Sequence, residues 1–264
     1  MMNIKAAGNL SYYSFGLLEP WPELTYAAFT RHGGVSAHPY DTLNMSYTVQ
    51  DDPERVKVNR ERAIRAVGWD PECVVSARQV HGRQVVAVSR AMVGGPDLPE
   101  TDALVTNEPG VLLLLKFADC VPIVLWDPKR RVVGLVHAGW RGTVLETPAA
   151  ALELMRQRYG CHPSSVLAGI GPSIGPCCYE VGTEVVAAAS TLFAGTTVIQ
   201  QVDGSHRMDL WGANAETLMR AGVAEENIAV AGVCTRCHHD QFFSHRAAKG
   251  IAGRFGVVAG IRDG

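Results

Sequence analysis

Long apolar runs and an excess of charge of one sign are both absent from this chain. The longest apolar run, residues 111–115, soon meets Lys116 and Asp119, far short of the ~20 residues that cross a bilayer. The 24 basic and 26 acidic side chains leave a net charge of -2, so no basic field concentrates nucleic acid or an anionic membrane. We therefore expect a small-molecule partner, no nucleic acid and no membrane.

A secretory signal and a disulfide framework are also lacking. The first 13 residues contain neither the apolar core nor the small-residue cleavage site of a signal peptide. Seven cysteines is an odd number, and a chain of 264 residues that is 47% hydrophobic can fill a core without covalent links. We therefore expect a soluble cytoplasmic protein, a monomer or weak homodimer, with free thiols of which at least one is functional.

The glycine-rich loops that bind nucleotides are missing too. Neither G-x-G-x-x-G nor G-x-x-x-x-G-K occurs. The nearest stretch, residues 169–175, has three glycines, with Pro172 inside it and Pro176 directly after it, and such a loop is equally suited to cradle a ligand or to turn a corner. A second loop, residues 31–36, contains two adjacent glycines and predicts a tight turn.

The remaining pattern predicts a mixed α+β fold. No repeat or linker is visible, so we expect an N-terminal segment, residues 1–24, packed on a single catalytic domain, residues 25–264. Consecutive strands without regular helix alternation favour a sandwich over a doubly wound sheet. Apolar runs predict strands at 25–30, 73–77, 85–89, 111–115, 121–126 and 132–136. Caps and composition predict helices from Pro53, capped by Asp51, to Gly68, and at 145–159, 183–192 and 210–221, before a tail that alternates apolar and polar residues over 228–261.

The strongest chemical constellation is His81, Cys120 and His137. Each lies near a predicted turn or strand end beside small residues. Two imidazoles and a thiolate suit Zn²⁺, whose catalytic sites keep a fourth position open for water or substrate. Zinc lowers the pKa of its bound water to ~7, or polarises an electrophile directly. The sequence therefore predicts a catalytic metal centre.

Two alternatives stay open for these residues. A cysteine in an apolar stretch is often a small core residue, and a histidine is often a structural hydrogen-bonding group. Alternatively, Cys120 is a nucleophile that His137 activates. The same three ligands also accept copper.

A rival metal site lies at residues 234–239. Its Cys-x-x-Cys pattern is half of a zinc knuckle, but a second half is missing. Cys177 and Cys178 are adjacent, and we expect them to be poorly arranged to chelate one ion together. The pattern with its following histidine also matches c-type haem attachment, which belongs to secreted electron carriers. We therefore expect the metal at His81 and its partners.

Other residues have both a functional and a structural interpretation. Arg31 and Arg141 lie close to glycines in predicted loops, where a guanidinium binds phosphate or carboxylate with two hydrogen bonds, although most arginines are simply exposed. Asp119 is either the partner that orients a ligating imidazole or a turn residue. Phe242 and Phe243 predict core, with a stacking platform for a base as the alternative.

Short motifs in a fixed order resemble one known family. They are RHGGVS at 31–36, DTLN at 41–44, QVHG at 79–82, TDAL at 101–104, ADCVP at 118–122, VHAGWRG at 136–142, GIGPSIGP at 169–176, CT at 234–235 and FFSHR at 242–246. This set resembles the YfiH family of laccase-domain proteins, also called multicopper polyphenol oxidases or peptidoglycan editing factors, from about residue 25 onward. The sequence departs from the family pattern at two places. His32 and His38 lie in and beside the Gly-Gly loop, which bears on substrate shape. Ala247 replaces a second arginine after Arg246, which bears on an anion contact.

The resemblance implies a single-domain α-β-β-α sandwich with mixed sheets, related to cysteine-hydrolase-like folds. It implies a metal, Zn²⁺ or else Cu²⁺, bound by His81, Cys120 and His137. It further implies a purine nucleoside phosphorylase that uses phosphate and acts on adenosine, inosine and methylthioadenosine, with adenosine deaminase activity and an older polyphenol oxidase label.

The oxidase label fits the sequence poorly. A multicopper laccase needs several coppers and His-x-His pairs, whereas this chain has nine histidines and no His-x-His. Phosphorolysis and deamination need one Lewis acid, a purine pocket and an anion site. Two further rivals remain: a metal-free thiol hydrolase or amidase acting on cell-wall precursors, and a non-catalytic binding module with a structural zinc.

Overall fold

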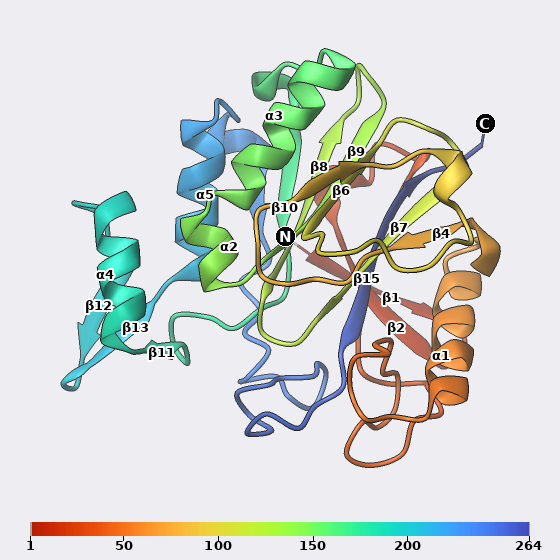
Figure 1. The fold of residues 1–264 in the computed structure, drawn as a ribbon, viewed down its shortest axis with the longest axis horizontal. Coiled ribbons are helices and arrows are strands. Elements are labelled where there is room, and N and C mark those ends of the chain that lie inside the picture. The colour runs from red at the N-terminus through yellow and green to blue at the C-terminus, as the bar shows by residue number, and fades with distance from the viewer. Residues whose placement is uncertain (1, 264) are drawn as a thin grey trace.

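The structure is a computed structural model that describes residues 2–263, and it contains two large mixed sheets (Figure 1). The first has the order β1-β2-β3-β15-β7-β4, with β4 parallel to β7 and the other pairs antiparallel. Its strands are β1 (Met2–Ala7), β2 (Leu10–Phe15), β3 (Leu24–Phe29), β4 (Val74–Ser76), β7 (Val111–Phe117) and β15 (Phe255–Ile261).

The second sheet has the order β14-β10-β8-β9-β6-β5 and is parallel only at its two outer pairs. Its strands are β5 (Val85–Ala87), β6 (Ala103–Thr106), β8 (Val121–Asp127), β9 (Val132–Ala138), β10 (Leu167–Ile170) and β14 (Ile228–Val230). A small third sheet contains β11 (Glu180–Val181), β12 (Ile199–Val202) and β13 (Ser205–Met208), beside helix α4 (Thr183–Leu192).

Helices cover the outer faces of both large sheets. Helix α1 (Pro53–Ala66) packs on the first sheet, and α2 (Trp140–Val144), α3 (Thr147–Tyr159) and α5 (Leu210–Arg220) pack on the second. The predicted α-β-β-α sandwich with mixed sheets is therefore confirmed. No helix in the part of the chain that the structure describes is long and apolar enough to cross a membrane.

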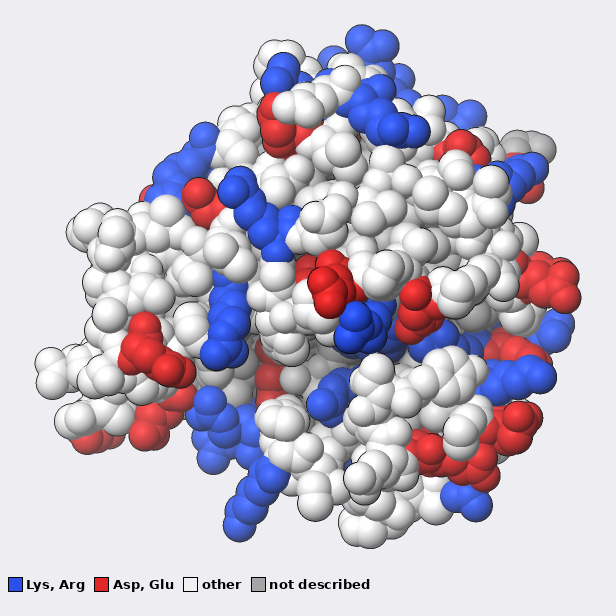
Figure 2. Space-filling view, in the orientation of Figure 1, with Lys and Arg blue, Asp and Glu red and all other residues white. Residues whose placement is uncertain are grey.

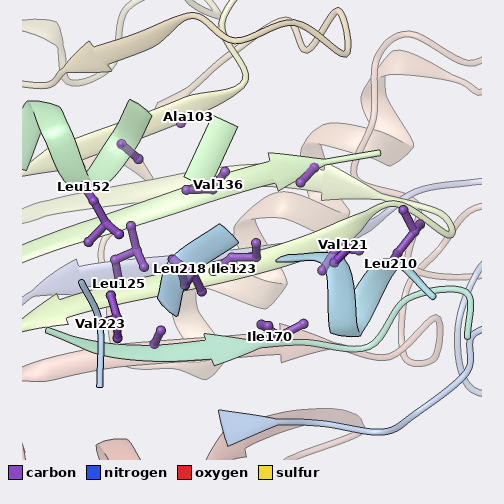
Figure 3. Close-up of a cluster of buried hydrophobic side chains, with 14 of the residues drawn as sticks. Ala103, Val121, Ile123, Leu125, Val136, Leu152, Ile170, Leu210, Leu218 and Val223 are labelled. Atoms are coloured by element: carbon purple, nitrogen blue, oxygen red, sulfur yellow. The ribbon is translucent and has the colours of Figure 1, made fainter. Parts of the chain in front are cut away.

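Alternate residues of the central strands face different layers. Leu113 of β7 and Val124 of β8 pack between the two sheets, whereas Leu114 faces α1 and Ile123 faces the helices on the other side (Figure 3). Because both faces of each strand are covered, these strands read as continuous apolar runs, which is why the sequence revealed them.

The cap of α1 differs from the prediction. Asp52, not Asp51, is the N-cap, and its side chain accepts a hydrogen bond from the backbone N–H of Glu54 at 2.9 Å. Proline is common at the first helical position, and the N-cap is the residue directly before it. Because the helix begins at Pro53, its N-cap is Asp52. The carboxylate of Asp51 instead accepts hydrogen bonds from Ser36 and Asn44, at 2.6 and 2.9 Å, and so fixes the loop with adjacent glycines.

The helix predicted at 145–159 is α3, which begins two residues later than predicted, and the short helix α2 before it was not predicted. Glu146 has a φ of 55°, a left-handed conformation that separates α2 from α3. Gly160, with a φ of 67°, ends α3 as predicted. The prediction for α4 is confirmed at both ends, and α5 ends one residue earlier than predicted.

The glycine-rich stretch 169–175 serves close packing. Gly169 lies inside β10, not in a loop, and a Cβ there would come within 2.4 Å of the Phe15 ring. A Cβ on Gly175 would come within 2.6 Å of Trp211. The tail 228–261 forms only β14 and β15, and turns fill most of the segment between them. Every residue of β15 is buried, so its pattern does not alternate.

Candidate metal centre

The side chains of His81, Cys120 and His137 converge although they are far apart in sequence. Their donor atoms all lie within 4.8 Å of one another. His81 lies between β4 and β5, Cys120 lies between β7 and β8, and His137 is near the end of β9. The antiparallel register of β8 and β9 places Pro122 opposite His137, which brings Cys120 to the same edge. His81 is exposed and His137 is buried, so the group has one side open to solvent.

Asp102 holds two of the three donor residues in place. It is fully buried and accepts a hydrogen bond from Nδ1 of His137 at 2.8 Å. It also accepts backbone N–H groups of the loop that carries His81, from His81 at 2.9 Å and from Gly82 at 2.7 Å. A carboxylate behind an imidazole fixes its tautomer and directs the other ring nitrogen at a metal. The sequence pattern contained Asp102 in the motif TDAL but assigned it no role.

The backbone around the three donors is constrained. His81 has a φ of 61° and Asp119 a φ of 83°, in the left-handed region that non-glycine residues rarely adopt. A Cβ on Gly139 would lie 2.9 Å from Sγ of Cys120 and 3.1 Å from Cδ2 of His81. Glycine at 139 therefore keeps space for the donor side chains.

The electrostatics favour a thiolate facing an imidazolium when no metal is bound. Burial opposes ionisation of Cys120, but His137 and His81 outweigh it and lower the pKa of this thiol to about 6. Burial likewise opposes protonation of His137, but Cys120 and Asp102 raise its pKa to about 9. Thiolate is the form of cysteine that binds metals. The donor set therefore fits a divalent metal such as zinc or copper.

A cavity of about 360 Å³ opens beside the three donors. Its wall carries four cationic side chains, Arg78, Lys116, Arg246 and Arg254, and one carboxylate, Asp119. Figure 2 shows Lys and Arg side chains around a hollow near the middle of the face drawn there, with acidic side chains among them. A pocket of this size and charge suits a small anionic ligand.

Arg246 and Arg254 stand out among these cations. Arg246 donates from Nη1 to the carbonyl of Glu180 at 3.0 Å, and Arg254 donates from Nη1 to the carbonyl of Gly253 at 3.0 Å. Neither forms an ion pair within residues 2–263, whereas Lys116 pairs with Asp97 at 3.2 Å. Their charge is therefore left for a ligand in the cavity.

The structure places Arg31 and Arg141 outside the wall of this cavity. The guanidinium of Arg31 donates to the carbonyls of Asp41 and His239 and lies over the ring of Phe243. Arg141 is exposed and lies over Trp140. Neither side chain lines the cavity, and Arg31 ties loops together.

The structure also assigns roles to Asp119 and to the pair Phe242 and Phe243, for which the sequence left two interpretations open. The carboxylate of Asp119 accepts hydrogen bonds from Thr235 at 2.6 Å and from the backbone N–H of Arg246 at 2.7 Å, so the partner of the imidazole is Asp102. Phe242 and Phe243 are 0% and 1% exposed. Their prediction as core is confirmed, and the alternative of a stacking platform is wrong.

Comparison with known proteins now places the chain. The family model described as multi-copper polyphenol oxidoreductase laccase matches residues 25–262. The chain belongs to this laccase-domain family. A relative from Geobacillus stearothermophilus, named purine nucleoside phosphorylase YlmD, is 38% identical over 89% of each chain. A purine nucleoside phosphorylase of Deinococcus radiodurans is 39% identical over 89% of this chain and 88% of its own.

Solved structures of the family share the fold. The crystal structure of the hypothetical protein YfiH from Bacillus licheniformis superimposes with a TM-score of 0.93 at 32% identity, over 99% of both chains. That of YlmD from Geobacillus stearothermophilus gives a TM-score of 0.92 at 35% identity, over 98% of both chains. The four-layer sandwich of this laccase-domain protein is thus the fold of its relatives.

Proposed function

We propose that this laccase-domain protein is a zinc-dependent purine nucleoside phosphorylase. The observation that carries the proposal is a three-donor cluster with one open side, next to a cavity that holds two arginines with no ion-pair partner among residues 2–263. Relatives named purine nucleoside phosphorylase support it. The substrates are adenosine, inosine or methylthioadenosine together with phosphate.

Each part of the cavity has a task in this reaction. A bound Zn²⁺ supplies a Lewis acid at His81, Cys120 and His137. Arg246 and Arg254 hold phosphate, since a guanidinium pairs with its oxygens through charge-assisted hydrogen bonds. A phosphate oxygen then bonds to the anomeric carbon, and the glycosidic C–N bond breaks. The base leaves with the bonding electrons and takes up a proton, and the sugar 1-phosphate remains, which is ribose 1-phosphate from adenosine or inosine and 5-methylthioribose 1-phosphate from methylthioadenosine.

Adenosine deamination at the same cavity is part of the proposal. A Zn²⁺ ion held by His81, Cys120 and His137 would supply the Lewis acidity that hydrolytic deamination of the purine ring needs, and the water that replaces the amino group would come from solvent. The products of that reaction are inosine and ammonia, so they are distinguishable from free base and sugar phosphate.

The test is product analysis on purified protein with a nucleoside panel. With phosphate we expect free base and ribose 1-phosphate, abolished by chelation and restored by Zn²⁺. Arg254→Ala should raise the KM for phosphate tenfold to a hundredfold, because a charged hydrogen bond contributes about 1.5–3 kcal/mol. Arg158→Ala, which replaces an exposed arginine of α3 outside the cavity wall, is the matched control and should leave the KM unchanged. Absence of both products from zinc-loaded protein would overturn the proposal.

A thiol hydrolase is the second candidate, because Cys120, His137 and Asp102 form a connected row like a catalytic triad. In that case metal-free protein would cleave an amide or ester substrate, and alkylation of Cys120 would abolish the reaction. Analysis of the bound metal separates the phosphorylase from the thiol hydrolase, and it also distinguishes zinc from copper.

A further inference from the structure

A second group of cysteines converges away from His81, Cys120 and His137. The sulfurs of Cys177, Cys178, Cys234 and Cys237 all lie within 4.8 Å of one another. Sγ of Cys237 is 3.7 Å from that of Cys177 and 3.5 Å from that of Cys178. The expectation that the adjacent pair is poorly arranged to serve one centre is therefore wrong, since both sulfurs reach Cys237. The missing half of the knuckle is this pair.

The spacing of these sulfurs suits a single tetrahedral ion. With Zn–S bonds of about 2.3 Å, the sulfurs of a tetrahedral site lie about 3.8 Å apart. A disulfide needs an S–S distance of about 2.05 Å, and all four cysteines are free thiols.

The backbone aligns the two cysteine-bearing segments before any ion binds. Ser173 and Cys234 form an isolated β-bridge, and the N–H of Thr235 donates to the carbonyl of Ser173 at 3.0 Å. The N–H of Gly175 donates to Sγ of Cys234 at 3.3 Å. Hydrogen bonds from the backbone to ligand atoms orient them and tune their affinity for a metal. The geometry is thus built into the chain.

We propose that Cys177, Cys178, Cys234 and Cys237 bind a second Zn²⁺ ion with a structural role. Four thiolates fill the tetrahedral shell, so no coordination position is left for water or substrate. Zinc is favoured over harder divalent ions because all four ligands are soft sulfurs. This inference is independent of the reaction proposed for the first centre.

The second ion would brace one wall of the catalytic cavity. The segments it joins carry Ile174, Tyr179 and Arg246, which line that cavity. Asp119 links the same segments, because its side chain accepts hydrogen bonds from Thr235 and Arg246 and its carbonyl accepts one from Ile174 at 2.9 Å. Loss of the ion should therefore loosen the position of Arg246.

The test counts zinc in protein prepared with a reductant. We expect two equivalents in the wild-type chain and one in the variant that combines Cys177→Ser with Cys237→Ser. A variant that combines Cys120→Ser with His137→Ala should also retain one. Cys73→Ser, which removes a half-buried thiol outside both groups, is the matched control and should retain two.

Wild-type protein supplies a second readout that needs no variant to fold. Co²⁺ should give the intense sulfur-to-metal charge-transfer absorption of a tetrathiolate site, and bound Zn²⁺ should protect these four cysteines from alkylation until a chelator is added. Zinc content that the Cys177/Cys237 variant leaves unchanged would overturn the proposal. So would labelling of denatured, unreduced protein that finds the four cysteines in disulfides.

Discussion

Replacement of Asp102 by asparagine tests the proposed metal centre most directly. One carboxylate oxygen accepts from Nδ1 of His137 and from the N–H of His81, and the other accepts from the N–H groups of Val80 and Gly82. An asparagine presents an NH₂ group in place of one oxygen. In either orientation two donors then face another donor.

Both orientations damage the centre. If the NH₂ group faces His137, Nδ1 must become an acceptor, so the proton moves to Nε2, the nitrogen meant for the metal. If it faces Val80 and Gly82, the loop that carries His81 loses its anchor. Loss of such a partner lowers metal affinity about 10–100-fold. Each partly buried donor that is left without an acceptor costs up to about 1–3 kcal/mol of unfolding free energy in the metal-free protein.

The assay is zinc competition against a chelator of known affinity, with urea unfolding of the metal-free protein as the second measurement. Asp127→Asn is the matched control. Asp127 is equally buried, but it lies at the opposite end of β8 and accepts two backbone N–H groups on one oxygen, which an asparagine can still do. An Asp102→Asn variant that bound zinc as tightly as wild type would refute the reasoning.

Three further outcomes are expected. Gly139→Ala should lower zinc content at least tenfold while the protein stays folded by circular dichroism, because the new methyl group would overlap Cys120 and His81. Burial lowers the pKa of Lys116 to about 8 from 10.5, so between these pH values the unfolded chain binds more protons than the folded one. In urea unfolding, the free energy of unfolding of wild type should therefore rise by up to about 3 kcal/mol relative to that of Lys116→Met as the pH increases through this window. Asn59→Ala should lower the free energy of unfolding, measured in urea, by about 2–4 kcal/mol. The reason is that the buried Asn59 side chain accepts a hydrogen bond from one backbone N–H of the segment 35–44 and donates to three acceptors in the same segment. A loss below about 0.5 kcal/mol would contradict this role.

The sequence predicted the fully buried central strands, and it also predicted helix α4, most of whose residues are not buried. Strands β7, β8 and β9 and helix α4 were recognisable because apolar runs and helix-forming residues act over a few neighbouring positions. Helix α2 was not, because it has only five residues, Gly142 among them, and no side chain caps its N-terminus.

Side-chain partners across the fold were harder to predict than the donor residues. The types and positions of His81, Cys120 and His137 suggested a metal, but the carboxylate behind His137 depends on β6 pairing with β9, a register that sequence spacing does not reveal. The same holds for Arg246 and Arg254, which reach the cavity from the irregular segment between β14 and β15.

The chain passes from the first sheet to the second at two points that matter chemically. His81 lies on the passage from β4 to β5, and Cys120 lies on the turn from β7 to β8. An ion bound by both residues would link the two connections between the sheets. The distance between the two sheets, which is set by side chains such as Trp126, would then affect the affinity for the ion. Substitutions in the core between the sheets should therefore alter zinc affinity without changing a ligand residue.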